Sequence, residues 1–417
     1  MSDARPSTAP LITNYTSLVL NNGARAIFVA RPRSPTLALQ LLVRAGSRHD
    51  GARPGLAHLV EHLVFRAPRE ERPDLFAAVE RLGGEVTATT GRDYTAFSLV
   101  VAAPDAGRAL ALLPALARPP ATDRASIRGE RQVIGHELRE RTRPADALWD
   151  LLLAALWGDD PLARPPAGAL AALSALTGRA AIDFYTRYYT APHLLVVGAG
   201  ACAPEPFADA VRMGLGALPD DGGALGPPAP PKTRLAALEQ PGGGPGSYVA
   251  VGVSVPGVEH PDSAALRLLE GVLGQGPGSR LGRALAARGL PATVQARYAA
   301  YAGVGVFAVL AAGPFTKVEA IAAALEAEVQ GLVTRPPTPA ALRTARRRLG
   351  TALYRHCESN AGLAGALGAE ALFADPHGPV DAALSAGLSV SLAQVRRAAN
   401  THLASAAFAR AALRPTI

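Results

Sequence analysis

Apolar and polar positions in the first half of the chain alternate as in strands before they take up helical spacing. Apolar stretches at 17–20 and 26–29 flank Asn21-Asn22-Gly23, and Asn-Gly between two such stretches is typical of a β-hairpin. Later stretches, where apolar residues recur every three or four positions, predict helices. We therefore expect, in chain order, this hairpin, a strand at 37–43, helices at 56–65 and 75–82, a strand pair within 84–102 and helices up to residue 116.

The second half of the chain repeats this order of elements. We expect a strand at 248–255, helices at 260–273 and 281–287, strands at 293–298 and 303–310, and helices at 317–333 and 338–357. Hairpin-forming strands mixed with helices favour an α+β fold, in which a mixed or antiparallel sheet packs against helices, over a doubly wound parallel sheet. The similar order in both halves indicates two tandem, homologous α+β domains.

A proline- and glycine-rich segment separates the two halves. Residues 219–246 contain few periodic apolar positions, and a segment of this composition forms a semi-stiff linker. The predicted organisation is an amino-terminal domain at 1–218, a linker at 219–246 and a carboxyl-terminal domain at 247–417.

Composition narrows the class of protein. Of the 417 residues, 49% are hydrophobic and 18% are charged, which excludes general disorder. No apolar run reaches the roughly 18 uncharged residues of a membrane span, and the amino terminus lacks the apolar region of an export signal. Two cysteines, Cys202 and Cys357, cannot build a disulfide framework or a four-thiolate zinc site. We therefore expect a soluble, cytoplasmic protein with no membrane partner.

The net charge of +8 raises nucleic-acid binding as an alternative. The arginines are scattered, however, and the densest run, at 343–348, falls on a helical pattern. Aromatic residues make up only 5% of the chain, and no stacking motif accompanies the basic residues. The run is therefore interpreted as a solvated helix face, and no nucleic-acid partner is expected.

The most specific chemical signal is His58-Leu59-Val60-Glu61-His62, inside the helix predicted at 56–65. Residues four apart share a helix face, so both imidazoles can bind one metal ion, and Glu61 on that face can reach a water molecule at the metal. Two imidazoles, an anionic ligand and a water molecule make up a catalytic zinc site. By chance, an H-x-x-E-H pentapeptide is expected only about 0.01 times in this chain. We therefore predict a zinc cofactor.

A third protein ligand is available further along the chain. Glu130 and Glu137 lie seven residues apart, two helical turns on one face. Glu137 is the predicted ligand, and Glu130 is predicted to orient a histidine from behind. His136 and Glu140 are competing candidates for the ligand. Since arginines surround the two glutamates, a charged helix face exposed to solvent is the alternative interpretation.

These motifs together resemble those of the pitrilysin/insulinase family of zinc peptidases, in particular its short bacterial members similar to mitochondrial processing peptidase. The family pattern is H-x-x-E-H followed about 75 residues later by the second glutamate of an E-x6-E pair, and His62 and Glu137 here are 75 residues apart. Further similar segments are 45–48 (AGSR), 90–95 (TGRDYT), 158–162 (GDDPL), 176–177 (LT), 184–189 (FYTRYY), 260–262 (HPD), 278–281 (GSRL) and 358–360 (ESN).

The resemblance implies a zinc endopeptidase built from two cupped halves around an enclosed chamber. Substrates would then be peptides or the flexible tails of precursors. Zinc would be held by His58, His62 and Glu137, with Glu61 as the general base. The peptide would pair through its main chain with an exposed edge strand. The residues expected in this strand are Thr87, Ala88, Thr89 and Thr90.

One departure from the family pattern bears on partners. Relatives that act alone carry an arginine and a tyrosine seven residues apart, as R-x-x-R-G-L-x-Y, which hold the substrate from the opposing half. Here Leu285 and Ala292 stand at those positions, and Tyr298 and Tyr301 are out of register. The resemblance therefore implies the catalytic subunit of a heterodimer whose partner lacks H-x-x-E-H but carries the arginine and tyrosine. A self-sufficient homodimeric peptidase and a non-catalytic subunit of a processing complex are the alternatives.

Overall fold

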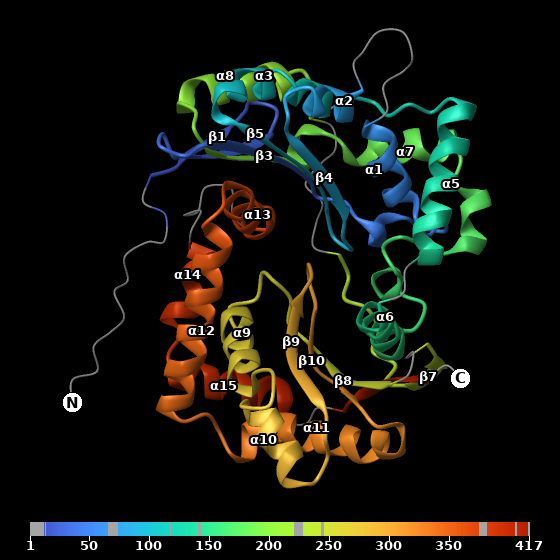
Figure 1. Cartoon of the computed structure of the whole chain (residues 1–417), viewed down its shortest axis with the longest axis vertical. Helices are drawn as coiled ribbons and strands as arrows, with labels where there is room; N and C mark the ends of the chain where they lie inside the picture. The colour runs from blue at the N-terminus through green and yellow to red at the C-terminus, as the bar shows by residue number, and fades with distance from the viewer. Residues whose placement is uncertain are drawn as a thin grey trace.

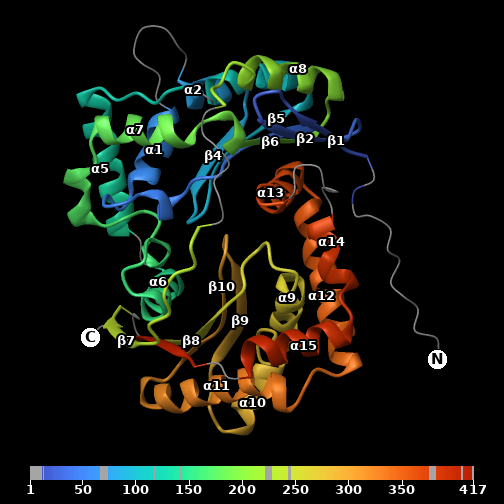
Figure 2. The same cartoon turned by 180° about the vertical axis from the view of Figure 1, so that it is seen from behind.

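The computed structural model describes residues 12, 14–65, 74–116, 118–140, 143–220, 228–242, 246–374, 382–404 and 407–415. They form two α+β halves, each built on one sheet (Figures 1 and 2). The predicted fold class, two tandem domains of sheets packed with helices, is confirmed.

The first sheet has the strand order β1-β2-β6-β3-β5-β4. Its strands are β1 (Thr16–Val19), β2 (Arg25–Ala30), β3 (Thr36–Val43), β4 (Glu85–Thr90), β5 (Thr95–Ala102) and β6 (Leu194–Gly200). The pair β2–β6 is parallel and the other neighbours are antiparallel. The predicted hairpin is confirmed as β1–β2, where Gly23 adopts a φ of 88° that favours glycine. Strand β4 ends the sheet and exposes an edge.

The second sheet has the order β7-β11-β8-β10-β9. Its strands are β7 (Ala237–Pro241), β8 (Ser247–Val255), β9 (Thr293–Ala300), β10 (Gly305–Gly313) and β11 (Ala409–Arg414). Strand β7 lies inside the segment 219–246 that the composition describes as a linker, and it pairs in parallel with β11. Because most of its side chains are exposed, no apolar alternation marks it as a strand.

Helices surround both sheets. The α-helices are α1 (Leu56–Phe65), α2 (Leu75–Glu80), α3 (Ala106–Leu110), α4 (Leu113–Leu116), α5 (Arg124–Glu140), α6 (Pro144–Trp157), α7 (Gly178–Tyr188), α8 (Pro204–Leu215), α9 (Ser263–Leu273), α10 (Arg280–Ala287), α11 (Val318–Thr334), α12 (Pro339–Cys357), α13 (Asn360–Ala371), α14 (Ala382–Ser389) and α15 (Leu392–Leu403). The 3-10 helices are η1 (Ser47–His49), η2 (Ala103–Asp105), η3 (Pro161–Ala163), η4 (Leu170–Ala175), η5 (Ala191–His193) and η6 (Phe315–Lys317). Within the described ranges, no helix combines the length and the apolarity that crossing a bilayer requires.

One helix from each half of the chain packs on the sheet of the other half. Helix α6, from the first half of the chain, packs on the second sheet, and helix α13, from the second half, packs on the first (Figure 1). The approach is close in both cases: a Cβ atom added at Gly252 in β8 would lie 3.0 Å from Leu152 of α6, and one added at Gly368 in α13 would lie 2.7 Å from Leu42 of β3. The division of the chain at 219–246 therefore does not separate two groups of elements that pack only among themselves.

Helix α13 is also anchored at both ends by arginines of the first half. Arg25 donates to the carbonyls of Ala371 and Leu372 at 3.0 and 2.9 Å. At the other end, Arg31 donates to the side-chain oxygen of Asn360 at 3.0 Å. Carbonyls at a helix end have no partner within the helix, so these bonds stabilise the docked position of α13.

Replacing Leu152 with alanine should destabilise the protein by about 2–5 kcal/mol, because Leu152 is fully buried between α6 and the second sheet. Urea unfolding followed by circular dichroism measures this change. Leu170→Ala, at a side chain that is 46% exposed, is the matched control and should change the free energy of unfolding by less than about 0.5 kcal/mol. Equal effects of the two substitutions would contradict the packing of α6 on the second sheet.

Candidate metal centre

Helix α1 presents the histidines from a firmly held position. Its apolar side packs in the core of the first half, and the side chains there are those of Leu59, Val60 and Leu63. Its amino terminus is capped by Asp50, which accepts hydrogen bonds from the backbone N–H groups of Gly55 and Ala57 at 2.6 and 2.8 Å. Burial raises the pKa of Asp50 to about 7, although these hydrogen bonds oppose the rise. The cap and the core together fix the direction in which α1 points its polar face.

Where the polar face of α1 meets helix α5, three atoms that can bind a metal ion lie close together. Nε2 of His58 lies 3.2 Å from Nε2 of His62, and these atoms lie 3.6 and 3.7 Å from Oε2 of Glu137. Two ligands bound about 2.0–2.1 Å from a tetrahedral zinc ion are separated by about 3.3 Å. The three atoms therefore fit one zinc ion. The Glu137 side chain is 48% exposed, so this arrangement is open on one side.

Glu130 lies behind the histidines. Its carboxylate is buried and lies 3.0 Å from Nδ1 of His62. Burial lowers the pKa of His62, but the hydrogen bond to Glu130 and the charges of Glu137 and Glu61 outweigh this effect and raise the pKa. A carboxylate at Nδ1 keeps the proton on that nitrogen and leaves the Nε2 lone pair toward the metal.

Replacing Glu130 with glutamine should weaken zinc binding by about 10- to 100-fold, because Nδ1 of His62 loses its charged acceptor. Competition against a chelating dye measures the affinity. Glu140→Gln, at an exposed position near the end of α5, is the control and should bind zinc as the wild type does. Weaker binding in Glu140→Gln than in Glu130→Gln would instead favour Glu140 as a ligand.

Glu61 lies beside the histidines and is held by the edge strand. Its ligand atom and those of His58 and His62 all lie within 4.8 Å of one another. The hydroxyl of Thr90 donates to Oε2 of Glu61, and the backbone N–H of Thr90 donates to the same carboxylate. Burial raises the pKa of Glu61, and the hydrogen bonds from Thr90 oppose this rise. The carboxylate is thus placed between the end of β4 and the three donor atoms.

Strand β4 contains the four residues predicted to bind a peptide, and their roles stay a prediction. Thr87 and Thr89 are exposed, whereas Ala88 and Thr90 are half-buried. The hydrogen bond from Gly91 N to Tyr94 O sets the alternation of the β4–β5 ladder. It directs the backbone groups of Ala88 and Thr90 to the free edge, in agreement with the bond from Thr90 N–H to Glu61.

The competing ligand candidates are less favourably placed. The ion pairs that the structure shows at the two histidines come from Glu137 and Glu130. His136 and Glu140 are both exposed on α5. Sequence reasoning missed the Asp50 cap, which the acidic residue ahead of the glycine before α1 could have indicated. It also missed the contact from Thr90 to Glu61, for which no local pattern exists.

A second group, formed by His260, Asp262 and His402, also has ligand atoms within 4.8 Å of one another. The backbone N–H of Asp262 donates to Nδ1 of His260 at 3.0 Å, which leaves the proton of the neutral ring on Nε2 and no lone pair for a metal. Arg397 lies 3.6 Å from Asp262 and would repel a cation. We therefore interpret the group as a hydrogen-bonded contact of Asp262 with His402, at 2.9 Å, and not as a metal site.

Models of known families match both halves of the chain. The model of insulinase (peptidase family M16) matches residues 25–169, and the model of the peptidase M16 inactive domain matches residues 175–349. The chain belongs to peptidase family M16. The first match includes all of the residues described above at the metal centre, and the second begins just before α7.

Individual relatives of this M16 chain agree with that assignment. An uncharacterized zinc protease of Mycobacterium leprae is 30% identical over 329 residues, which cover 75% of this chain and 73% of that protein. Subunit beta of the mitochondrial-processing peptidase of Homo sapiens is 25% identical over 246 residues, covering 57% of this chain and 50% of that protein. A protease from Helicobacter pylori has the same fold, with a TM-score of 0.85, 22% identity and coverage of 97% and 100% of the two chains.

In the M16 inactive domain of this chain, the positions expected to hold the arginine and tyrosine are occupied differently. Leu285 is buried in the core of the second half. The hydroxyl of Tyr298 donates to the carbonyl of Pro256 at 2.9 Å, and the hydroxyl of Tyr301 accepts from the indole N–H of Trp149 at 3.3 Å. Both tyrosine hydroxyls are thus engaged in hydrogen bonds within the chain.

His49, next to the loop that precedes α1, makes the stability of the protein depend on pH. Burial and the charge of Arg48 lower the pKa of His49 from 6.5 to about 4. Between pH 6.5 and 4 His49 is therefore more protonated in the unfolded chain than in the folded one, so its contribution to the free energy of unfolding falls as the pH falls. His49→Gln should remove a pH-dependent loss on the order of 3 kcal/mol.

Urea unfolding between pH 4.5 and 7.5 measures this dependence. The difference in free energy of unfolding between the wild type and His49→Gln should shrink toward acidic pH. His136→Gln, at an exposed histidine, should instead run parallel to the wild type. Parallel curves for His49→Gln would contradict the lowered pKa.

Proposed function

We propose that this M16 chain is a zinc-dependent endopeptidase. The observation that carries the proposal is the triangle of His58, His62 and Glu137, with the carboxylate of Glu61 held beside it by Thr90. This donor set, two imidazoles and one carboxylate with an open side, is typical of catalytic zinc. The relative from Mycobacterium leprae, named a zinc protease, supports the same chemistry.

The residues of the chain divide the work of hydrolysis. Zinc bound at the three donors would polarise the scissile carbonyl and acidify a water molecule. Glu61 takes the proton of the attacking water and delivers it to the leaving nitrogen. Its contacts with Thr90 fix the carboxylate in the orientation that this transfer needs. Glu130 keeps His62 in the tautomer that leaves Nε2 unprotonated.

The edge of β4 supports binding of an extended peptide. The free backbone groups of Ala88 and the carbonyl of Thr90 offer main-chain hydrogen bonds to an added strand. Main-chain hydrogen bonds depend little on the side chains of the substrate, so they select weakly among peptide sequences. The exposed side chains of Thr87 and Thr89 contact only one face of the substrate. Substrates of the proposed enzyme are therefore peptides or flexible precursor tails, enclosed in a chamber formed with a second chain.

That second chain is proposed to be a different subunit. Leu285 and Ala292 leave this chain without the arginine and tyrosine expected in relatives that act alone, and Tyr298 and Tyr301 are engaged elsewhere. The relative from Homo sapiens is itself named as a subunit of a peptidase. We propose a heterodimer in which the partner supplies the two missing side chains. A homodimer that works without them is the second candidate.

The test is cleavage of an unstructured peptide mixture by the zinc-loaded chain, read by mass spectrometry. The chain alone should cleave slowly, and a related chain with the arginine and tyrosine but without H-x-x-E-H should accelerate cleavage at least tenfold. Full activity of the chain alone, at the mass of a dimer, would favour the homodimer. Failure to bind zinc and to cleave in either setting would overturn the proposed enzyme and favour a non-catalytic subunit.

A further inference from the structure

The turn at 91–94 directly follows β4. It is held by the segment 46–48, which contains the start of η1 and precedes α1. The carbonyl of Gly91 accepts a hydrogen bond from Ser47 N at 3.0 Å, and the carbonyl of Arg92 accepts one from Arg48 N at 3.0 Å. The two segments approach so closely that position 46 has no room for a side chain. A Cβ atom added at Gly46 would lie 2.4 Å from the carbonyl oxygen of Gly91. The turn and the segment 46–48 therefore move as one piece.

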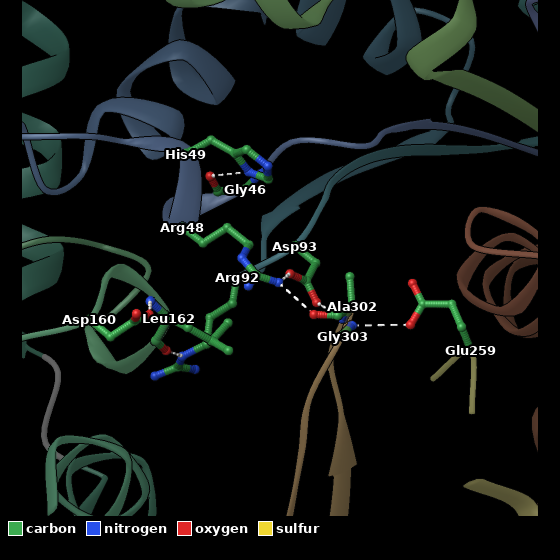
Figure 3. A network of polar contacts seen from close by, with 10 residues as sticks. All are labelled: Gly46, Arg48, His49, Arg92, Asp93, Asp160, Leu162, Glu259, Ala302 and Gly303. Carbon is green, nitrogen blue, oxygen red and sulfur yellow. Dashed lines mark hydrogen bonds and ion pairs between the residues drawn. The ribbon is translucent and has the colours of Figure 1, made fainter. Parts of the chain in front are cut away.

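The second half of the chain reaches this same turn. Figure 3 shows Ala302, at the tip of the β9–β10 hairpin, next to the ion pair of Arg48 and Asp93. The guanidinium of Arg48 lies 2.5 Å from Oδ1 of Asp93 and donates to the carbonyl of Ala302 at 3.0 Å. The backbone N–H of Ala302 donates to Oδ2 of Asp93 at 2.8 Å. The backbone of a single residue of the second half, Ala302, thus forms hydrogen bonds with both Arg48 and Asp93.

The pair is shielded from solvent. The side chains of Arg48 and Asp93 are 7% and 6% exposed. A buried ion pair depends on complete hydrogen bonding, and the loss of one partner leaves an uncompensated charge. The tip of the hairpin supplies two of the bonds that this pair makes, so its position is tied to the position of Asp93.

Helix α6 adds a third attachment to the turn. Arg92 donates to the carbonyl of Leu162 at 2.8 Å and to the carboxylate of Asp150 on α6 at 2.5 Å. Since α6 packs on the second sheet, this bond also transmits the position of the second half. The turn is therefore attached to both halves through the neighbouring side chains of Arg92 and Asp93.

Thr90 connects the turn to the metal centre. It is the last residue of β4 and immediately precedes Gly91, and its hydroxyl and backbone N–H both donate to Glu61. A displacement of the turn would move Thr90 and with it the orientation of the Glu61 carboxylate. Ala302 is thus hydrogen-bonded to Asp93, the main chain joins Asp93 to Thr90, and Thr90 is hydrogen-bonded to Glu61.

We propose that Asp93 is a positioning residue through which the second half of the chain holds Glu61 in its reactive orientation. Although the second half matches an M16 domain termed inactive, it contributes to catalysis in the same chain by clamping the turn at 91–94. This proposal rests on the proposed peptidase function. It requires no contact of Asp93 with zinc or with substrate.

The test compares Asp93→Asn with the wild type in the full-length, zinc-loaded chain. The substitution keeps the size of the side chain but removes the charge that pairs with Arg48. Turnover should fall by about 10- to 100-fold, because small displacements of a catalytic group reduce rates by such factors, while KM and zinc stoichiometry stay within twofold. Hydrogen exchange of peptides covering 86–91, read by mass spectrometry, should accelerate at least fivefold.

Glu259→Gln is the matched control. Exposed Glu259 accepts from Gly303 N at 3.1 Å, so the substitution changes the same hairpin tip without touching the ion pair (Figure 3). It should leave turnover and exchange at the wild-type level. If Asp93→Asn does not fold, Arg48→Lys, which keeps the positive charge but shortens the donor, replaces it with the same readouts.

Each outcome decides the proposal. Unchanged turnover in a folded Asp93→Asn chain overturns it, and so does a loss of turnover accompanied by an equal loss in Glu259→Gln. If the wild type cleaves no peptide, the proposed peptidase function fails by itself. The exchange of 86–91 then still tests the coupling: acceleration in Asp93→Asn alone supports it, and equal exchange in all chains overturns it.

Discussion

Replacing Glu61 with glutamine should lower peptide hydrolysis by about 10²- to 10⁴-fold while zinc binding stays unchanged. Glutamine has the same shape and can still accept from Thr90, but it cannot take a proton from water. The affinity for zinc should persist, because the three donor atoms that match its geometry belong to His58, His62 and Glu137. Steady-state cleavage and zinc titration on the same preparation separate the two effects.

Thr90→Val is the informative companion to this substitution. It removes the hydroxyl that donates to Glu61 but keeps the carboxylate and the backbone N–H, so its loss of turnover should be smaller than that of Glu61→Gln. Full activity in Glu61→Gln would remove Glu61 from the role of base. Loss of zinc in Glu61→Gln would instead show that Glu61 supports the metal.

Replacing Glu137 with alanine should abolish hydrolysis through the opposite route, by loss of the metal. Structural zinc sites bind with roughly 12 kcal/mol, and an equal share for each of three protein ligands is about 4 kcal/mol, or about 10³-fold in affinity. Zinc competition against a chelating dye measures this loss. Excess zinc should restore part of the activity to Glu137→Ala and none to Glu61→Gln.

Glu140→Ala on the same helix is the control for charge. It removes one negative charge at an exposed position and should keep both zinc and activity. If Glu137→Ala binds zinc as tightly as the wild type, the third ligand lies elsewhere, and exposed His136 becomes the next candidate to substitute.

Local pattern predicted many of the strands and helices, but neither β6 nor β11. The hairpin at β1–β2 was predicted by Asn-Gly between two apolar stretches, and α1 has the predicted bounds. These predictions succeed because periodicity and turn chemistry act over a few residues. Strand β7 was missed for the same reason: its exposed side chains carry no alternation, and its pairing with β11 joins segments about 170 residues apart.

The candidate site divides in a similar way. The residues of H-x-x-E-H were evident because helix geometry alone brings positions four apart together. The choice of Glu137 rested on the spacing of two glutamates and on resemblance, and the structure places it beside both histidines. The contacts of Thr90 with Glu61 and of Asp93 with Ala302 join residues 29 and 209 positions apart, so no spacing rule could indicate them.

By itself, the sequence determined the hairpin at β1–β2, the duplicated α+β plan and the pair of imidazoles on one helix face, because each depends on neighbours along the chain. The tertiary structure alone decided which sheet α6 and α13 cover, and how the tip of the second half meets the turn beside Glu61. The physical reason is that apolar helices and buried ion pairs are satisfied by any partner of suitable shape and charge. Only the folded arrangement of the whole chain selects that partner.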